Sequence, residues 1–119
     1  MNPYQAAILF LVSLNASLRI AHWSADTVTN EHKALGDLYD ALDGLTDDFA
    51  ETAIPRIGTR DFPNMTSDLV RSYPQLIEDA LEVVGELFAQ CQADNAQDLL
   101  NIAADMQAAL NRAKYFLRL

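Results

Sequence analysis

Four residues of this chain have side chains that could together bind a metal ion: the histidines His22 and His32 and the carboxylates Asp47 and Glu51. Asp47 and Glu51 are four positions apart, so on a helix both carboxylates lie on one face within reach of a shared cation. Imidazole and carboxylate ligands together suit iron, manganese or zinc, and of these we expect iron. A structural zinc site is disfavoured because the chain has a single cysteine, Cys91.

Four amphipathic helices are predicted to position these residues, because apolar residues recur at spacings of three and four along most of the chain. We expect helices over residues 4–24 and 30–54, a third that ends near Gln92, and a fourth from Asn95 onward. Thr29 or Asn30 suits the N-cap of the second helix. Asp94 and Gln97 form a capping-box pattern at the start of the fourth. The pattern predicts an all-α four-helix bundle as a single domain over residues 1–119.

Composition excludes several other classes of protein. The chain has 17 acidic and 8 basic residues and a formal net charge of −9, which argues against nucleic-acid binding. Its single cysteine cannot form an intrachain disulfide, so a reducing, cytoplasmic environment is expected. The most apolar stretch, residues 6–12, is soon interrupted by polar residues and has no basic residue before it. We interpret it as part of a buried helix, with no membrane span and no targeting signal.

Helix geometry limits how the candidate ligands could meet. His32 and Asp47 are 15 positions apart on one predicted helix, which is about 22 Å along its axis. They therefore cannot bind one metal ion within one chain. Two copies of this helix packed antiparallel across a two-fold axis would bring His32 of one copy to Asp47 and Glu51 of the other, and symmetry would create two such sites. A di-iron site within one chain would need Glu-x-x-His motifs, which the sequence lacks.

The segments His22-Trp23, residues 32–40 and residues 47–51 resemble the Dps-like mini-ferritins of the ferritin-like superfamily. That family has a His-Trp pair, a second histidine at the head of the next helix, and then Asp and Glu four residues apart. The resemblance implies a ferritin-like bundle in which His22, His32, Asp47 and Glu51 are both catalytic residues and metal ligands of a ferroxidase site. Trp23 would be the aromatic residue beside this site.

By the same resemblance, the protein would oxidise Fe²⁺ with peroxide or dioxygen, store iron and protect against oxidative stress. Its partner would be further copies of itself, joined through two-fold interfaces into a dodecameric shell. The interval from His22 to His32 is two residues shorter than in the family pattern, and the chain has no lysine-rich N-terminal arm for compacting DNA. The chain is also similar to short ferritin-like proteins of tailed bacteriophages.

Two other interpretations of the same residues remain open. The acidic residues of the second helix could simply form a solvated face, with two incidental histidines nearby. Alternatively, the protein could be a non-catalytic ferritin-like scaffold or partner-binding protein without a working metal site, which the short interval between the histidines favours.

Overall fold

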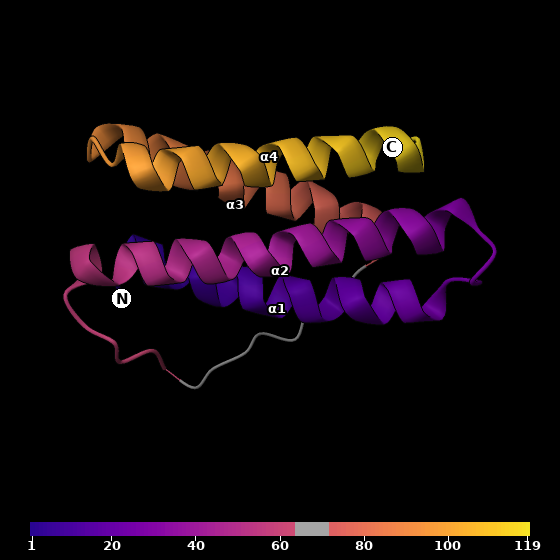
Figure 1. The fold of residues 1–119 in the computed structure, drawn as a ribbon, viewed down its shortest axis with the longest axis horizontal. Helices are drawn as coiled ribbons and strands as arrows, with labels where there is room; N and C mark the ends of the chain where they lie inside the picture. The colour runs from indigo at the N-terminus through magenta and orange to yellow at the C-terminus, as the bar shows by residue number, and fades with distance from the viewer. Residues whose placement is uncertain (64–71) are drawn as a thin grey trace.

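A computed structural model describes residues 1–63 and 72–119, and these residues form four α-helices and no strand. The helices are α1 (Pro3–Ser24), α2 (Asn30–Ile57), α3 (Tyr73–Ala93) and α4 (Gln97–Leu117). α1 and α2 form one antiparallel hairpin, and α3 and α4 form another (Figure 1). The predicted all-α four-helix bundle is confirmed.

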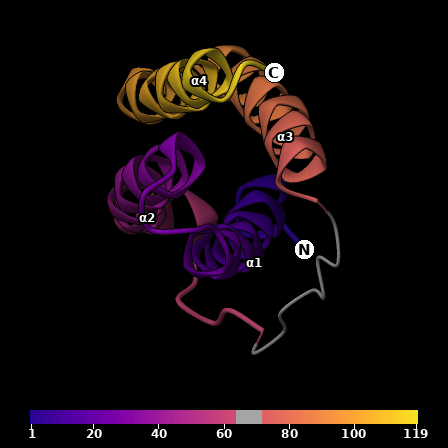
Figure 2. The ribbon, with the colours of Figure 1, turned by 90° about the vertical axis from the view of Figure 1, so that its right-hand side faces the viewer.

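Each helix packs against two others, so the bundle closes in the order α1, α2, α4, α3 (Figure 2). α2 ends at the end of the bundle where the N-terminus lies, and α3 begins at the opposite end (Figure 1). Every packed pair is therefore antiparallel, while α2 and α3 are parallel and diagonal to each other. This connectivity places the α1–α2 hairpin beside the start of α3 and the end of α4.

The core consists of apolar side chains from all four helices. On α2, the apolar residues at spacings of three and four are buried, except that Leu45 is half-buried; the buried ones are Leu35, Leu38, Leu42 and Phe49. Phe49 is the largest of these and is fully buried, and it lies against the ring of Tyr4 from α1 with the ring centroids 6.0 Å apart. The largest fully buried side chains elsewhere include Leu11, Leu14, Leu18, Leu76, Ile77, Leu99, Met106 and Leu110.

The ends of α2 differ in how well the sequence predicted them. Of the two predicted candidates, Thr29 is the N-cap, and its hydroxyl accepts a hydrogen bond from the backbone N–H of His32 at 3.2 Å. The predicted end at residue 54 was wrong, because the helix continues through Pro55 to Ile57. Pro55 lacks a backbone N–H and so removes one intrahelical hydrogen bond, and Gly58 then ends the helix in the left-handed conformation with φ of 81°.

The predicted capping box at the start of α4 was wrong. Ala96 is the N-cap and makes no side-chain capping bond, and Asp94 instead ends α3. The Asp94 carboxylate accepts a hydrogen bond from the hydroxyl of Tyr4 at 2.5 Å, so it is turned toward α1 and away from the first turn of α4. Asn95, with φ of 53°, makes the tight turn between the two helices.

α1 is the one helix of the described residues that is long and apolar enough, by length and composition, to cross a membrane. In the structure, 39% of its most apolar 18-residue stretch is buried against the rest of the bundle. The predicted buried helix is thus buried on one side, and its other side is exposed.

We predict that the bond from Tyr4 to Asp94 makes a pH-dependent contribution to stability. This bond lowers the pKa of the Asp94 carboxyl below its ordinary value of 3.8, and burial raises the pKa of the Tyr4 hydroxyl. A carboxyl whose pKa is lowered by folding stabilises the folded state above its unfolded pKa, and this contribution is lost as the pH falls through the folded pKa. The substitution Tyr4→Phe should therefore destabilise the protein at pH 7, and less so below about pH 4.

Chemical denaturation of the wild type and of Tyr4→Phe between pH 2.5 and 7 measures this difference. Tyr115→Phe is the control, because the side chain of Tyr115 is exposed and its hydroxyl makes no hydrogen bond within the described residues. A difference between Tyr4→Phe and the wild type that stays constant down to pH 2.5 would contradict the prediction.

Candidate functional site

The two histidines lie against each other where the α1–α2 hairpin closes. His22 is in the last turn of α1 and His32 is in the first turn of α2. Their rings are stacked, with centroids 3.9 Å apart and planes inclined by 29°. Nδ1 of His22 lies 2.7 Å from the carbonyl oxygen of His32, and Nδ1 of His32 lies 2.8 Å from the carbonyl oxygen of His22. The hairpin thus brings the two histidines together, as expected.

These two hydrogen bonds determine which ring nitrogen carries the proton. A carbonyl oxygen can only accept, so Nδ1 must be the donor in both rings. The lone pair of each neutral imidazole is then on Nε2, and no hydrogen bond within the described residues engages either Nε2. Histidines that bind metals commonly have this arrangement, in which one ring nitrogen donates to a carbonyl and the other binds the ion.

Gly36 provides the space for this pair, and the sequence analysis did not identify it. A Cβ at position 36 would lie 2.7 Å from Cε1 and 2.9 Å from Nδ1 of His22. A glycine inside a helix lowers helix stability by about 1 kcal/mol relative to alanine. The position of the His22 ring, which Gly36 permits, has to compensate for this loss. The available signal was a glycine one helical turn after His32 in an otherwise regular helical pattern.

Side-chain bonds between α1 and α2 fix the hairpin in register. The amide of Asn15 donates a hydrogen bond to the hydroxyl of Thr46 at 3.1 Å, and both residues are buried. The guanidinium of Arg19 donates to the hydroxyl of Tyr39 and lies 4.5 Å from the centroid of its ring. A shift of one helix along the other would break both contacts, so they also hold the histidine pair together.

Asp47 and Glu51 lie elsewhere on α2 and are exposed. Asp40 and Asp43 are also exposed and continue the same helix face toward the hairpin. Within the part of the chain that the structure describes, no group of three or more His, Cys, Asp or Glu side chains could hold a metal ion. A single copy therefore brings His22 and His32 together but not with Asp47 and Glu51.

The outer side of α1 carries a row of exposed apolar residues, which we call the α1 stripe. It consists of Val12, Ala16, Ile20 and Trp23, whose spacing of four, four and three places them on one face of the helix. The exposed fractions of Val12, Ile20 and Trp23 are 46%, 59% and 67%. Trp23 is thus outside the core, although it follows His22 directly in the sequence. An exposed apolar row of this kind is typical of a contact surface.

We predict that the space at Gly36 is needed for the histidine stack. Gly36→Ala should displace the ring of His22 and break its hydrogen bond, and the protein should lose stability despite the better helix propensity of alanine. Gly44→Ala is a matched control on the same helix, because an added Cβ there meets nothing within 4 Å. The control should gain about 1 kcal/mol in the free energy of unfolding.

Chemical denaturation measures both substitutions, and ¹⁵N shifts of the imidazole nitrogens report whether the Nδ1-protonated form persists. Equal stabilisation by the two substitutions, with unchanged imidazole shifts, would mean that Gly36 has no role in holding the pair.

Comparison with known proteins provides a family but no described relative. Neither the curated proteins nor the solved structures contain a match to this chain. A family model described as a family of unknown function matches residues 22–117, a segment that begins at His22 and includes all four candidate ligands. The chain therefore belongs to this family of unknown function, DUF5856.

Proposed function

We propose that the protein binds Fe²⁺ as a substrate and oxidises it at sites formed between two copies of the chain. His22 and His32 of one copy would act with Asp47 and Glu51 of the other. The observation that carries this proposal is the pair of hydrogen bonds from Nδ1 to backbone carbonyl oxygens, which fix both rings and leave both Nε2 atoms for an ion. The connectivity of the bundle, with its single crossover between two hairpins, also fits the ferritin-like expectation.

Two copies are required because the histidines and the carboxylates are far apart on one chain. His32 and Asp47 are separated by about 22 Å along α2, so an antiparallel neighbour is needed to bring them together. The α1 stripe supplies an apolar surface for such a contact, and it lies on the helix that carries His22. Burying this row between two copies would remove its apolar area from water, which favours association.

The chemistry follows from the types of ligand. Neutral imidazoles and ionised carboxylates bind Fe²⁺ and leave coordination positions for an oxidant. Each Fe²⁺ loses one electron, so one peroxide molecule, which takes up two electrons, oxidises two Fe²⁺ ions. The Fe³⁺ product hydrolyses and releases protons. The net charge of −9 favours the approach of cations, and storage of the product would take place inside a closed shell of such subunits.

Anaerobic titration with Fe²⁺, followed by addition of peroxide or air, tests this function. We expect about one or two iron ions bound per chain and oxidation faster than in a control without protein. His32→Ala and Asp47→Ala should each slow oxidation by about tenfold or more, because each removes a ligand. Asp43→Ala is the matched control, since Asp43 is an exposed carboxylate on the same helix outside the proposed ligand set. Equal rates for all variants would reject the site.

A mixing experiment tests whether the site is shared between copies. His32→Ala and Asp47→Ala chains are each slowed about tenfold or more when alone under the proposal, but a mixed dimer combines the intact His32 of one chain with the intact Asp47 of the other. A statistical mixture should recover about one quarter of the wild-type rate, because half of the dimers are mixed and each has one intact site. No recovery in mixtures that mass spectrometry shows to contain mixed dimers would exclude a shared site.

The second candidate function is a non-catalytic scaffold or partner-binding protein. Its supporting observation is that each histidine already bonds to the other residue's backbone, so the pair can close the hairpin without a metal ion. In that case His22→Ala would lower the stability of the protein, and the wild type would oxidise iron no faster than the control without protein.

A further inference from the structure

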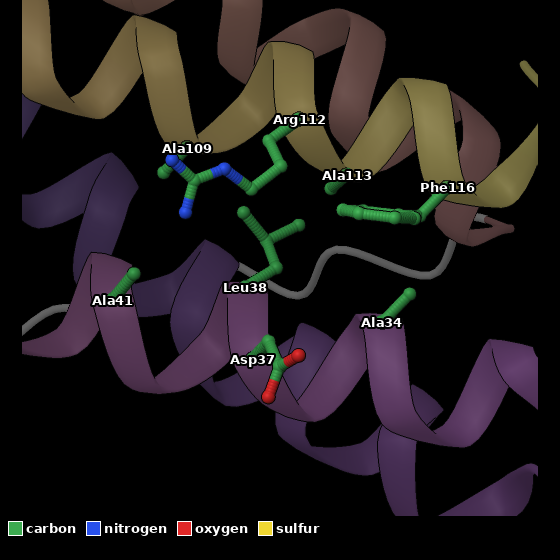
Figure 3. A pocket seen from close by; sticks show the side chains of 8 residues that line it. All are labelled: Ala34, Asp37, Leu38, Ala41, Ala109, Arg112, Ala113 and Phe116. Atoms are coloured by element: carbon green, nitrogen blue, oxygen red, sulfur yellow. The ribbon is translucent and has the colours of Figure 1, made fainter.

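A second exposed surface lies at the end of the bundle where α4 finishes. Tyr115 and Phe116 are 79% and 50% exposed, and their ring centroids are 5.4 Å apart in an edge-to-face arrangement. The amide of Asn30 donates a hydrogen bond to the carbonyl oxygen of Phe116 at 2.6 Å, which attaches this turn to the start of α2. Figure 3 shows the ring of Phe116 at the edge of a shallow groove between α2 and α4, above Ala34.

Two arginines flank these aromatic rings. Arg112 lines the same α2–α4 groove, and Arg118 lines a neighbouring pocket that Tyr115 and Phe116 share. Neither arginine makes an ion pair with any residue in the described ranges. The lysine close to them, Lys114, is already paired with Glu78 at 2.8 Å. We call Arg112, Tyr115, Phe116 and Arg118 the end patch. Aromatic and arginine side chains are the types that dominate binding at protein interfaces.

A complementary surface lies between α1 and α3. Phe10 and Val83 line two adjoining pockets there, and Glu86 borders both of them. Glu82 lies one turn before Glu86 on α3 and borders one of the pockets. Both glutamates are exposed and make no ion pair with any residue of segments 1–63 and 72–119. We call this surface the acid-rimmed groove.

We propose that the end patch of one copy docks into the acid-rimmed groove of a second copy. The aromatic rings of Tyr115 and Phe116 would contact Phe10 and Val83, and the free arginines would face the free glutamates. The patch lies on the side of the bundle formed by α2 and α4, and the groove lies on the opposite side, between α1 and α3 (Figure 2), so the patch of one molecule cannot reach its own groove. The contact is therefore head-to-tail, and repeating it produces a ring or a chain of molecules.

The proposed head-to-tail contact uses neither the histidine pair nor the α1 stripe. Whether it forms therefore does not depend on whether the protein oxidises iron. The alternative occupant of an aromatic and basic surface is an anionic membrane. We favour a second copy because the same chain provides both the apolar groove and the two unpaired acidic residues.

Charge reversal tests the contact, with association measured by sedimentation at 50 and 300 mM NaCl. Arg118→Glu and Glu86→Lys should each weaken association about tenfold at the lower salt concentration, and Phe116→Ala should weaken it at both. Arg60→Glu and Asp105→Lys are matched controls, since each reverses an exposed charge outside both surfaces. Circular dichroism checks that every variant keeps its helices.

Mixing the two weakened variants makes the test specific for a head-to-tail contact. The Arg118→Glu chain keeps an intact groove, and the Glu86→Lys chain keeps an intact patch, so an equimolar mixture should associate about tenfold more tightly than either alone. Three outcomes would overturn the proposal. The first is that the α1 stripe variant Ile20→Glu abolishes all self-association. The second is that the control variants weaken association as much as the test variants do, and the third is that the mixture associates no more tightly than either variant alone. Binding of the wild type, but not of Phe116→Ala, to phosphatidylserine vesicles without self-association would assign the patch to a membrane.

Discussion

The pair of hydrogen bonds between each histidine ring and the other residue's carbonyl oxygen is the interaction on which the candidate site depends. It joins the last turn of α1 to the first turn of α2, determines which nitrogen carries the proton, and holds the rings in a stack. The bond between Asn15 and Thr46 and the contact between Arg19 and Tyr39 maintain the register that makes this geometry possible. The site is therefore a property of the whole α1–α2 hairpin, because both helices must be correctly placed for the rings to meet.

The same arrangement explains why the hairpin is compatible with two functions. The bonds from each Nδ1 to a carbonyl oxygen can orient the rings as metal ligands, and they also join α1 to α2. A folded single chain needs them only to join the two helices. The difference lies in Nε2, which makes no hydrogen bond with the described residues and is the atom that would bind an ion. Asp47 and Glu51 are similar in this respect, since both are exposed and neither packs in the core.

Much of the fold could be predicted because helix periodicity is a local property of the sequence. The spacing of apolar residues identified all four helices, and Thr29 was one of two predicted N-cap candidates, because a capping hydroxyl bonds within its own turn. Prediction failed where a distant residue decides the local structure. Asp94 has the sequence of a helix cap, but Tyr4, 90 positions away, engages its carboxylate. Gly36 was not predicted for the same reason, because its role is to leave space for the ring of His22 from α1.

The candidate site was predictable in part. The two histidines could be placed together from the short interval between their helices, and their distance from Asp47 could be calculated from the helix rise. The stacking and the reciprocal bonds could not be foreseen, because they depend on the rotation of each helix about its axis, which is set by core packing.

The antiparallel order of all packed helix pairs has an electrostatic consequence. Each end of the bundle has the N-termini of two helices and the C-termini of the other two, so the helix dipoles oppose one another and largely cancel. The backbone therefore gives the molecule no strongly positive or negative pole. Its long-range electric field therefore comes from the charged side chains, whose formal net charge is −9, and this field attracts cations. The attraction varies over the surface only with the local distribution of Asp, Glu, Lys and Arg.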